Sequence, residues 1–114
     1  MMAKYCVIGG TNPIGGREEE FYRWYEAVHL RDVLKVSGTL NARLYRAVGN
    51  AKYKYFAIVE LDTDDPVAVL AELSARGGTP DMELTDALNM SDISVAPYQL
   101  IVTRGKNDHA STRA

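Results

Sequence analysis

The sequence predicts a ferredoxin-like α+β domain, in which a four-stranded antiparallel sheet carries two helices on one face. Strand and helix patterns follow one another in the order β-α-β-β-α-β, which is typical of this arrangement. The 114 residues are enough for one hydrophobic core and too few for two, so we expect a single domain. Apolar residues at 46% and charged residues at 25% place the chain among ordinary globular domains.

The chain opens with a predicted strand and a loop. Residues 3–9 form a short apolar run that ends at Gly9-Gly10, and residues 11–16 have the proline and glycine content of a loop. A strand, a glycine-containing loop and a helix could hold a phosphate, but neither glycine motif of nucleotide-binding proteins is present. The three acidic residues 18–20 would also repel a phosphate at the start of the helix. Nucleotide binding is therefore not expected.

Residues 17–34 are predicted to form the first helix, and Gly38 provides a left-handed stop after it. Large apolar side chains recur there at the spacing of one helix face: Phe21, Trp24, Tyr25 and Val28. His29 follows Tyr25 by one turn, so we expect its ring at the edge of this aromatic face.

Two strands follow, joined by a turn at Gly49-Asn50. Residues 39–48 alternate between two faces, one formed by Leu40, Ala42 and Leu44 and the other by Asn41, Arg43 and Tyr45. Residues 52–62 also alternate, but both of their faces are apolar, with Tyr55, Ala57, Val59 and Leu61 opposite Phe56 and Ile58. Apolar side chains on both faces indicate a sheet that is covered on both sides in its middle.

The last third contains a helix and a final strand. Residues 66–76 are predicted as a helix, because capping residues and a proline stand at its start. Residues 79–92 are less regular, and we expect a short helical turn packed over the sheet edge. Residues 93–104 form the predicted fourth strand, with Pro97 at an edge or a bulge. Residues 1–104 thus make up the domain, and the polar residues 105–114 are expected to be a flexible tail.

Charge and cysteine content exclude several classes of protein. A net charge of −2 argues against a nucleic-acid binder, because phosphate binding requires a basic surface. No apolar run approaches the ~20 residues of a membrane span, and the N-terminus lacks the core of a signal peptide. Cys6 is the single cysteine and lies in an apolar run, which favours a buried small hydrophobe. We therefore expect a cytoplasmic protein.

The second apolar face of the sheet predicts a partner. Two helices can cover only one face, and the chain is too short to supply another layer. The simplest solution is a symmetric homodimer that buries the open sheet face of one subunit against the other.

A family resemblance supports this fold. The segment EEFYRWYEAVHLRDVL at residues 19–34, followed by Gly38 and by Arg43-Leu-Tyr45, resembles the dimeric α/β-barrel superfamily, and within it the EthD-like group. Proteins of that group carry an aromatic first helix that ends in a histidine, although Arg31 stands here where the group has a proline. The resemblance covers residues 3–104 in topology and 12–46 in motif. It implies a pocket between the first helix and the sheet; superfamily members include cofactor-free lyases, isomerases, polyketide cyclases and monooxygenases, and others bind heme.

His29 is the candidate catalytic residue. A free imidazole titrates near pH ~6.5, so it can take up and return a proton at neutral pH. Asp32 and Glu26 are within helical reach of it, and either could accept the Nδ1 proton, with Asp32 preferred. Tyr25 could donate a hydrogen bond to an enolate or phenolate oxygen. The alternative is a structural histidine that bonds a backbone carbonyl.

The other candidate site residues are aromatic or basic. Phe21 and Trp24 are candidates for substrate binding, although such side chains more often belong to a core. Arg43 and Tyr45 are further candidates; they share one face of their strand, and the sequence leaves open whether that face meets the pocket or the dimer partner. His109 lies in the tail and is expected to be solvated.

These residues predict a cofactor-free enzyme of lyase, isomerase or cyclase type, with His29 as general acid and base. Its ligand would be an aromatic, polyketide-like or otherwise apolar small molecule. No metal set is present, because His29 has no second histidine outside the tail, and no cofactor is expected. The rivals are a cofactor-independent monooxygenase and a non-catalytic binding homodimer, which could also bind heme through one axial histidine.

Overall fold

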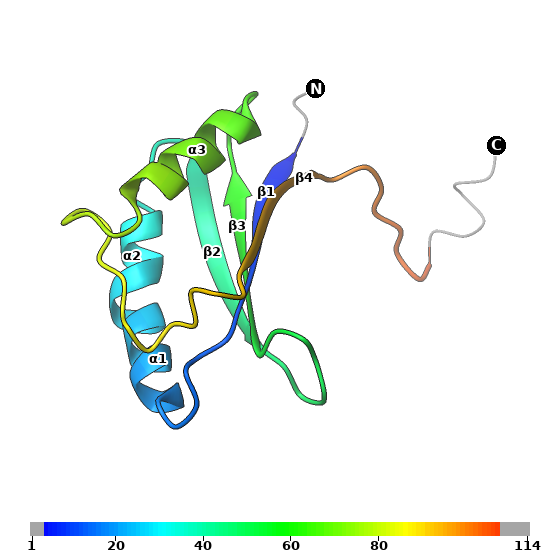
Figure 1. The fold of residues 1–114 in the computed structure, drawn as a ribbon. Coiled ribbons are helices and arrows are strands. Elements are labelled where there is room, and N and C mark those ends of the chain that lie inside the picture. Colours follow the sequence, from blue (N-terminus) through cyan, green and yellow to red (C-terminus); the bar gives the residue numbers. More distant parts are fainter. Residues whose placement is uncertain (1–3, 108–114) are drawn as a thin grey trace.

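The computed structural model describes residues 4–107 and has the predicted ferredoxin-like fold (Figure 1). Its sheet has the strand order β2-β3-β1-β4, and every neighbouring pair is antiparallel. The helices lie together on one face of this sheet (Figure 1). The strands are β1 (Tyr5–Thr11), β2 (Thr39–Arg46), β3 (Tyr55–Leu61) and β4 (Ser94–Gln99).

The first helical segment is continuous from residue 18 to residue 33 but changes its winding midway. It consists of α1 (Glu18–Trp24), the π-helical turn η1 (Tyr25–His29) and α2 (Leu30–Val33). The second helix, α3 (Pro66–Arg76), begins as predicted, because the Asp65 side chain accepts a hydrogen bond from the Ala68 N–H at 3.1 Å.

The π-turn shifts the buried face of the first helix by one residue. In a regular α-helix Val28 would continue the face of Phe21 and Tyr25, but its side chain is 36% exposed. The wider turn adds a residue, so His29 and Leu30 occupy the inner side and Val33 is buried after them. The predicted position of Val28 was therefore wrong, because the 3.6-residue period does not hold through η1.

β1 does not end at Gly9-Gly10 but runs on to Thr11. Both glycines are paired on two sides, with β3 and with β4, so the ladders continue through them. A side chain at Gly10 would collide with the ring of Tyr53, since a Cβ there would lie 2.8 Å from two of its carbon atoms. Gly10 thus allows the Tyr53 ring to approach the backbone closely within a continuous strand. The sequence pattern had instead indicated that the strand ends here.

The remaining strands are shorter than predicted or irregular. β2 ends at Arg46 and β3 begins at Tyr55, and a bulge between Thr39 and Asn41 leaves Leu40 58% exposed rather than beside Ala42. β4 ends at Gln99 instead of residue 104. Residues 100–107 run away from the sheet without regular structure (Figure 1).

Residues 79–92 form turns rather than the expected helical turn, and only a single bridge joins Leu88 to Pro13. Pro97 lies in the edge strand β4, as predicted.

Within residues 4–107 no helix is long and apolar enough to cross a membrane. His109 and most of the predicted tail lie outside the described residues.

The core lies between the helices and the sheet. One cluster joins β1, β3 and α3 around Val59 and Val69, and the other surrounds Phe21, whose side chain is fully buried. As predicted, β3 points alternate residues toward this core, and those residues are buried: Tyr55, Ala57, Val59 and Leu61. The helix-covered side of the sheet therefore carries the hydrophobic core.

The opposite side of the sheet, called here the open face, has no covering element among the described residues (Figure 1). Strand register places Tyr45 beside Phe56 and Tyr98 beside Cys6 on this face. Tyr45 and Tyr98 are about half exposed, and Phe56 is 40% exposed. Cys6 is only half-buried here rather than fully buried as expected, and burial raises the pKa of its thiol.

Candidate functional site

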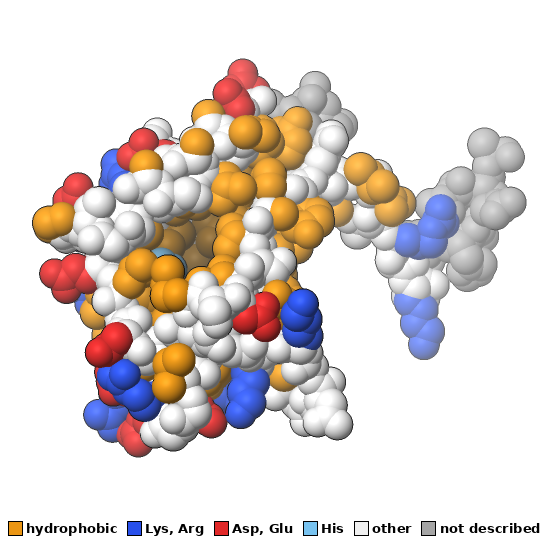
Figure 2. All heavy atoms as spheres, in the orientation of Figure 1, with side chains coloured by type: hydrophobic (Ala, Val, Ile, Leu, Met, Phe, Trp, Pro, Cys, Tyr) orange, Lys and Arg blue, Asp and Glu red, His pale blue; other side chains and the backbone are white. Residues whose placement is uncertain are grey.

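A cavity of about 360 Å³ separates the helices from the sheet. Its walls come from β1, β3, the inner side of the first helix, α3 and the segment 77–93. Figure 2 shows the molecule hollowed on this side, with mainly hydrophobic side chains around the hollow and a histidine visible inside it. The volume falls in the range of sites for small molecules.

The π-turn places His29 in the cavity wall. Its ring stacks on Trp24 with centroids 4.5 Å apart and an angle of 23° between the planes. The ring of Tyr25 stands edge-on to it, with centroids 5.1 Å apart. The structure therefore brings together three of the predicted site residues, and all three line the cavity.

The predicted hydrogen bond from His29 to a carboxylate is not formed. Asp32 pairs with Lys35 instead, at 3.4 Å between Oδ1 and Nζ, and Glu26 lies beside the hydroxyl of Tyr22. His29 Nδ1 is buried and has no hydrogen-bond partner among the described residues. The extra residue of the π-turn changes the angular spacing between Glu26 and His29, whereas Asp32 lies near His29 but directs its carboxylate to Lys35.

Burial controls the protonation of His29. It lowers the pKa of the imidazole to about 4, and the nearby Asp32 carboxylate opposes this shift only in part. The ring is therefore neutral at pH 7, with one nitrogen as donor and the other as acceptor. A neutral imidazole can accept a proton or a hydrogen bond from a ligand.

Thr11 is a site residue that the sequence did not reveal. It lies at the end of β1 among the lining residues and is 7% exposed; its Oγ1 interacts with the Tyr25 hydroxyl and forms no other hydrogen bond to a described residue. Beside it, burial raises the pKa of Tyr25 to about 12, with the Thr11 hydroxyl opposing the shift. Tyr25 thus stays protonated at neutral pH. The alternation of Val7, Gly9 and Thr11 could have identified this residue if the strand had been extended.

Three predicted substrate-binding residues lie elsewhere. Phe21 is buried in the core, where its ring packs against Trp24, Tyr25 and Tyr55, and it does not line the cavity. Arg43 and Tyr45 lie on the open face, because β2 pairs them with Ile58 and Phe56. Arg43 forms an ion pair there with Glu60 at 3.3 Å.

Residues 77–93, called here the strap, close one side of the cavity. Met82, Leu84, Leu88 and Met90 line it from this segment. The strap is held to the first helix and its preceding loop, because Trp24 Nε1 donates to the Glu83 carbonyl at 2.9 Å and Ile14 N–H donates to the Ala87 carbonyl.

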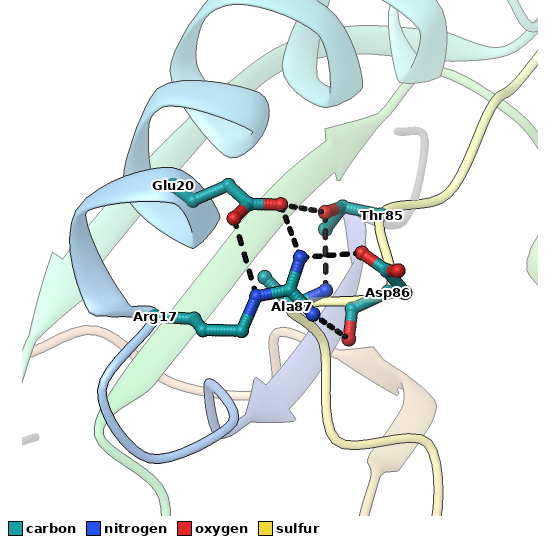
Figure 3. Close-up of polar contacts among 5 residues, drawn as sticks. All are labelled: Arg17, Glu20, Thr85, Asp86 and Ala87. Carbon is teal, nitrogen blue, oxygen red and sulfur yellow. Dashed lines mark hydrogen bonds and ion pairs between the residues drawn. The ribbon is translucent and has the colours of Figure 1, made fainter.

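Arg17 provides the polar anchor of the strap. Figure 3 shows its guanidinium group between Glu20 of α1 and Asp86 of the strap, with Thr85 beside it. Arg17 Nη2 lies 2.6 Å from the Asp86 carboxylate, and Nη1 donates to the Asp86 carbonyl at 3.2 Å. The network fixes the strap at the start of the helix that carries His29.

The cavity wall contains no Lys, Arg, Asp or Glu. Its polar groups are those of Thr11, Tyr25, His29 and Ser74, and the other lining side chains are apolar apart from the indole of Trp24. Residues 4–107 contain no cluster of three His, Cys, Asp or Glu side chains that could hold a metal ion. The arrangement therefore suits an uncharged, mainly apolar molecule with a small number of hydrogen-bonding groups.

Comparison with known proteins identifies the fold. No protein-family model matches the sequence, and no curated protein matches it. Among solved structures, the chain is similar to a candidate monooxygenase from Shewanella loihica, with a TM-score of 0.64 and 17% identity over 90% of this chain and 100% of that one. It is also similar to the heme-degrader MhuD from Mycobacterium tuberculosis, solved with two hemes in its active site (TM-score 0.60, 16% identity, 89% and 99% covered).

A third similar structure belongs to the group indicated by the motif of the first helix. It is an EthD family protein from Bacillus halodurans, with a TM-score of 0.55 and 14% identity over 88% of this chain and 100% of that one. The chain thus has the ferredoxin-like fold that its sequence predicted, and it shares this fold with an EthD family protein. Identities this low establish the fold and leave the reaction to be argued from the site.

Proposed function

We propose that this protein binds a small, uncharged, mainly apolar molecule in the cavity and acts on it as a cofactor-free enzyme. One observation carries the proposal. The buried side-chain atoms of the described chain that lack a hydrogen bond of ordinary geometry are His29 Nδ1 and Thr11 Oγ1, and both belong to residues in the wall of this one cavity; Thr11 Oγ1 has only the Tyr25 hydroxyl beside it. Buried polar groups are nearly always paired, so the unpaired ones mark where a ligand would supply the missing partner.

His29 would carry the proton in a lyase, isomerase or cyclase type of reaction. As a neutral imidazole it accepts a proton from a carbon next to a carbonyl group, and the electron pair of the broken C–H bond moves to the carbonyl oxygen as an enolate. The anion beside the new imidazolium favours the charged pair in an environment of low dielectric constant. Tyr25, which keeps its proton, would donate a hydrogen bond to the enolate oxygen, and His29 would then return the proton to another carbon.

The proposal can be tested by deuterium exchange into 2-tetralone, an uncharged bicyclic ketone with acidic C–H bonds. Proton NMR in D₂O would follow the loss of the signal at the carbon between the ring and the carbonyl. We expect the wild-type protein to accelerate the exchange, His29→Gln to abolish the acceleration, and Arg23→Gln on the exposed side of α1 to retain it. Equal rates for the wild type and His29→Gln would refute the role of His29.

A cofactor-independent monooxygenase is the second candidate, because the Shewanella loihica protein of the same fold is described as a candidate monooxygenase. An apolar cavity with one base would suit both reactions. Oxygen consumption during turnover, measured with an electrode, separates them: a lyase or isomerase consumes none.

Heme fits this cavity less well, although MhuD binds it. His29 could serve as an axial ligand, but the two carboxylates of heme need cationic partners, and none of the lining residues is cationic. We therefore propose no resident heme. Titration with hemin would show a Soret shift dependent on His29 if this assignment is wrong.

We also propose that two copies associate through their open faces. The exposed rings of Tyr45, Phe56 and Tyr98 form an apolar surface on a sheet whose other face is already covered. A second copy would cover this surface symmetrically. Size-exclusion chromatography with light scattering at micromolar concentration should give twice the mass of one chain, and the mass of a single chain would contradict the proposal.

A further inference from the structure

Apart from Ser74 of α3, the polar groups of the cavity lie in one part of the wall, at Thr11 of β1 and His29 of η1. Tyr25 joins them, because its hydroxyl lies beside Thr11 and its ring stands edge-on to His29. We call these three residues the polar corner. The Thr11 side chain is more than nine-tenths buried and lines the cavity, and its Oγ1 can both donate and accept a hydrogen bond.

The rest of the wall restricts the charge of the ligand. An ionised group in the cavity would lose its water without meeting an opposite charge, because no Lys, Arg, Asp or Glu lines the cavity. His29 does not compensate, since burial keeps it neutral at pH 7. A carboxylate or phosphate is therefore disfavoured, whereas a ketone or a hydroxyl group meets partners in the polar corner.

Gly9 provides room next to this corner. It shares the cavity face of β1 with Thr11, and an added Cβ would meet only Val95 Cγ2 at 3.6 Å and Ser94 O at 3.9 Å, which are ordinary contacts. The backbone does not require glycine here, because its φ is not in the left-handed region. The missing side chain instead leaves space for the body of a ligand beside Thr11.

We infer that the ligand is an uncharged cyclic ketone or alcohol whose oxygen is bound by Thr11 and Tyr25 while its ring lies along Gly9 and a neighbouring carbon faces His29. The inference rests on the proposed function, since it names the class of molecule that the same cavity takes. It assigns to Thr11 a part in recognition that is separate from proton transfer. Oxygenated and plain hydrocarbon ligands of one carbon skeleton should then differ in affinity.

Three probes of one skeleton test this: tetralin, 1-tetralone and tetralin-1-carboxylate. Dissociation constants would be measured by protein-observed NMR titration of the full chain at pH 7. We expect 1-tetralone to bind about tenfold more tightly than tetralin, because tetralin offers no hydrogen-bonding partner to the polar groups of the site. The carboxylate should bind most weakly.

Variants locate the source of the preference. Thr11→Val keeps the shape and removes the hydroxyl, so it should reduce the preference for 1-tetralone over tetralin to about threefold or less. Thr11→Ser should retain the preference. Gly9→Val fills the cavity beside the corner and should weaken tetralin and 1-tetralone alike.

The outcomes separate this inference from the proposed function. If tetralin and 1-tetralone bind equally well to the wild type, or if the carboxylate binds most tightly, the assignment of the ligand class is wrong while the cavity remains a binding site. An unchanged preference in Thr11→Val overturns the role of Thr11. If none of the three probes binds, the inference and the proposed function both fail. The wild-type comparison requires no variant, so it decides the ligand class even if Thr11→Val does not fold.

Discussion

The two faces of the sheet contain similar apolar residues but different polar groups. On the covered face, small residues such as Ala57 and Val59 leave a cavity below the helices, and its wall contains buried polar atoms without partners. On the open face the large rings of Tyr45 and Phe56 lie exposed, and the charged groups among them pair, as Arg43 does with Glu60.

This difference separates two functions. A cavity with unpaired polar atoms can select a small molecule by its hydrogen bonds, whereas a flat surface of exposed rings provides area for another protein. The same strand, β3, contributes residues to both faces, because alternate residues point to opposite sides. The predictions below test this division, beginning with the largest expected effect.

Phe21→Ala should destabilise the protein far more than Phe56→Ala. Phe21 is fully buried under the cavity wall, so its loss should cost about 3–5 kcal/mol of unfolding free energy. Phe56 is 40% exposed, and the same change in the isolated subunit should cost about 1 kcal/mol. Urea denaturation at low protein concentration measures both. Similar losses would mean that the open face belongs to the core.

His29 should make the covered face sensitive to acid. The unfolded chain takes up a proton on this residue near its ordinary pKa of 6.5, and the folded chain only near 4. Stability should therefore fall as the pH decreases through this window, by at most ~3 kcal/mol at about 1.4 kcal/mol per pH unit.

His29→Phe keeps a ring in the wall and removes the titration. Its free energy of unfolding should fall less between pH 6.5 and 4 than that of the wild type. If the two proteins lose stability in parallel, the imidazole is not buried as a neutral ring.

Phe56→Glu should dissociate the proposed dimer while sparing the cavity. A carboxylate in the middle of an apolar interface should weaken association by about 2 kcal/mol or more, roughly thirtyfold in dissociation constant. Val67→Glu is the matched control, because Val67 is 66% exposed on α3, on the other side of the sheet. Analytical ultracentrifugation would compare them, and dissociation by both variants would point to a different interface.

Arg17→Met should have the smallest effect on stability, below about 1 kcal/mol, since its ion pairs are partly exposed to solvent. It should nevertheless loosen the strap, because Arg17 joins α1 to Asp86 (Figure 3). Hydrogen exchange should become faster for amides of residues 82–90 and remain unchanged in β3. Unchanged exchange in the strap would show that the backbone hydrogen bonds of Ile14 and Asn89 suffice to hold it.

The order of elements could be predicted because it depends on local patterns. Apolar periodicity, the proline at the start of α3 and the glycine after α2 identify elements without reference to the rest of the chain. The same periodicity put Trp24, Tyr25 and His29 together, and the structure confirms that they share a wall.

The features that failed depend mostly on contacts between distant segments. β1 passes through Gly9-Gly10 because both residues pair with β3 and β4, and Gly10 leaves room for the ring of Tyr53; these contacts cannot be read from the local sequence. The same error hid Thr11, whose position depends on the continued strand. The predicted partner of His29 was wrong for a local reason: Asp32 pairs with Lys35, and the added residue in η1 changes the position of Glu26 relative to His29.

The most direct test of the division between the two faces is a two-dimensional NMR titration of the wild-type protein with 1-tetralone. We expect the largest shifts at the indole N–H of Trp24 and at the amides of Thr11 and His29, with little change at Phe56 and Tyr98. Shifts concentrated at Phe56 and Tyr98 would place the ligand on the open face and contradict the assignment of the cavity as the binding site.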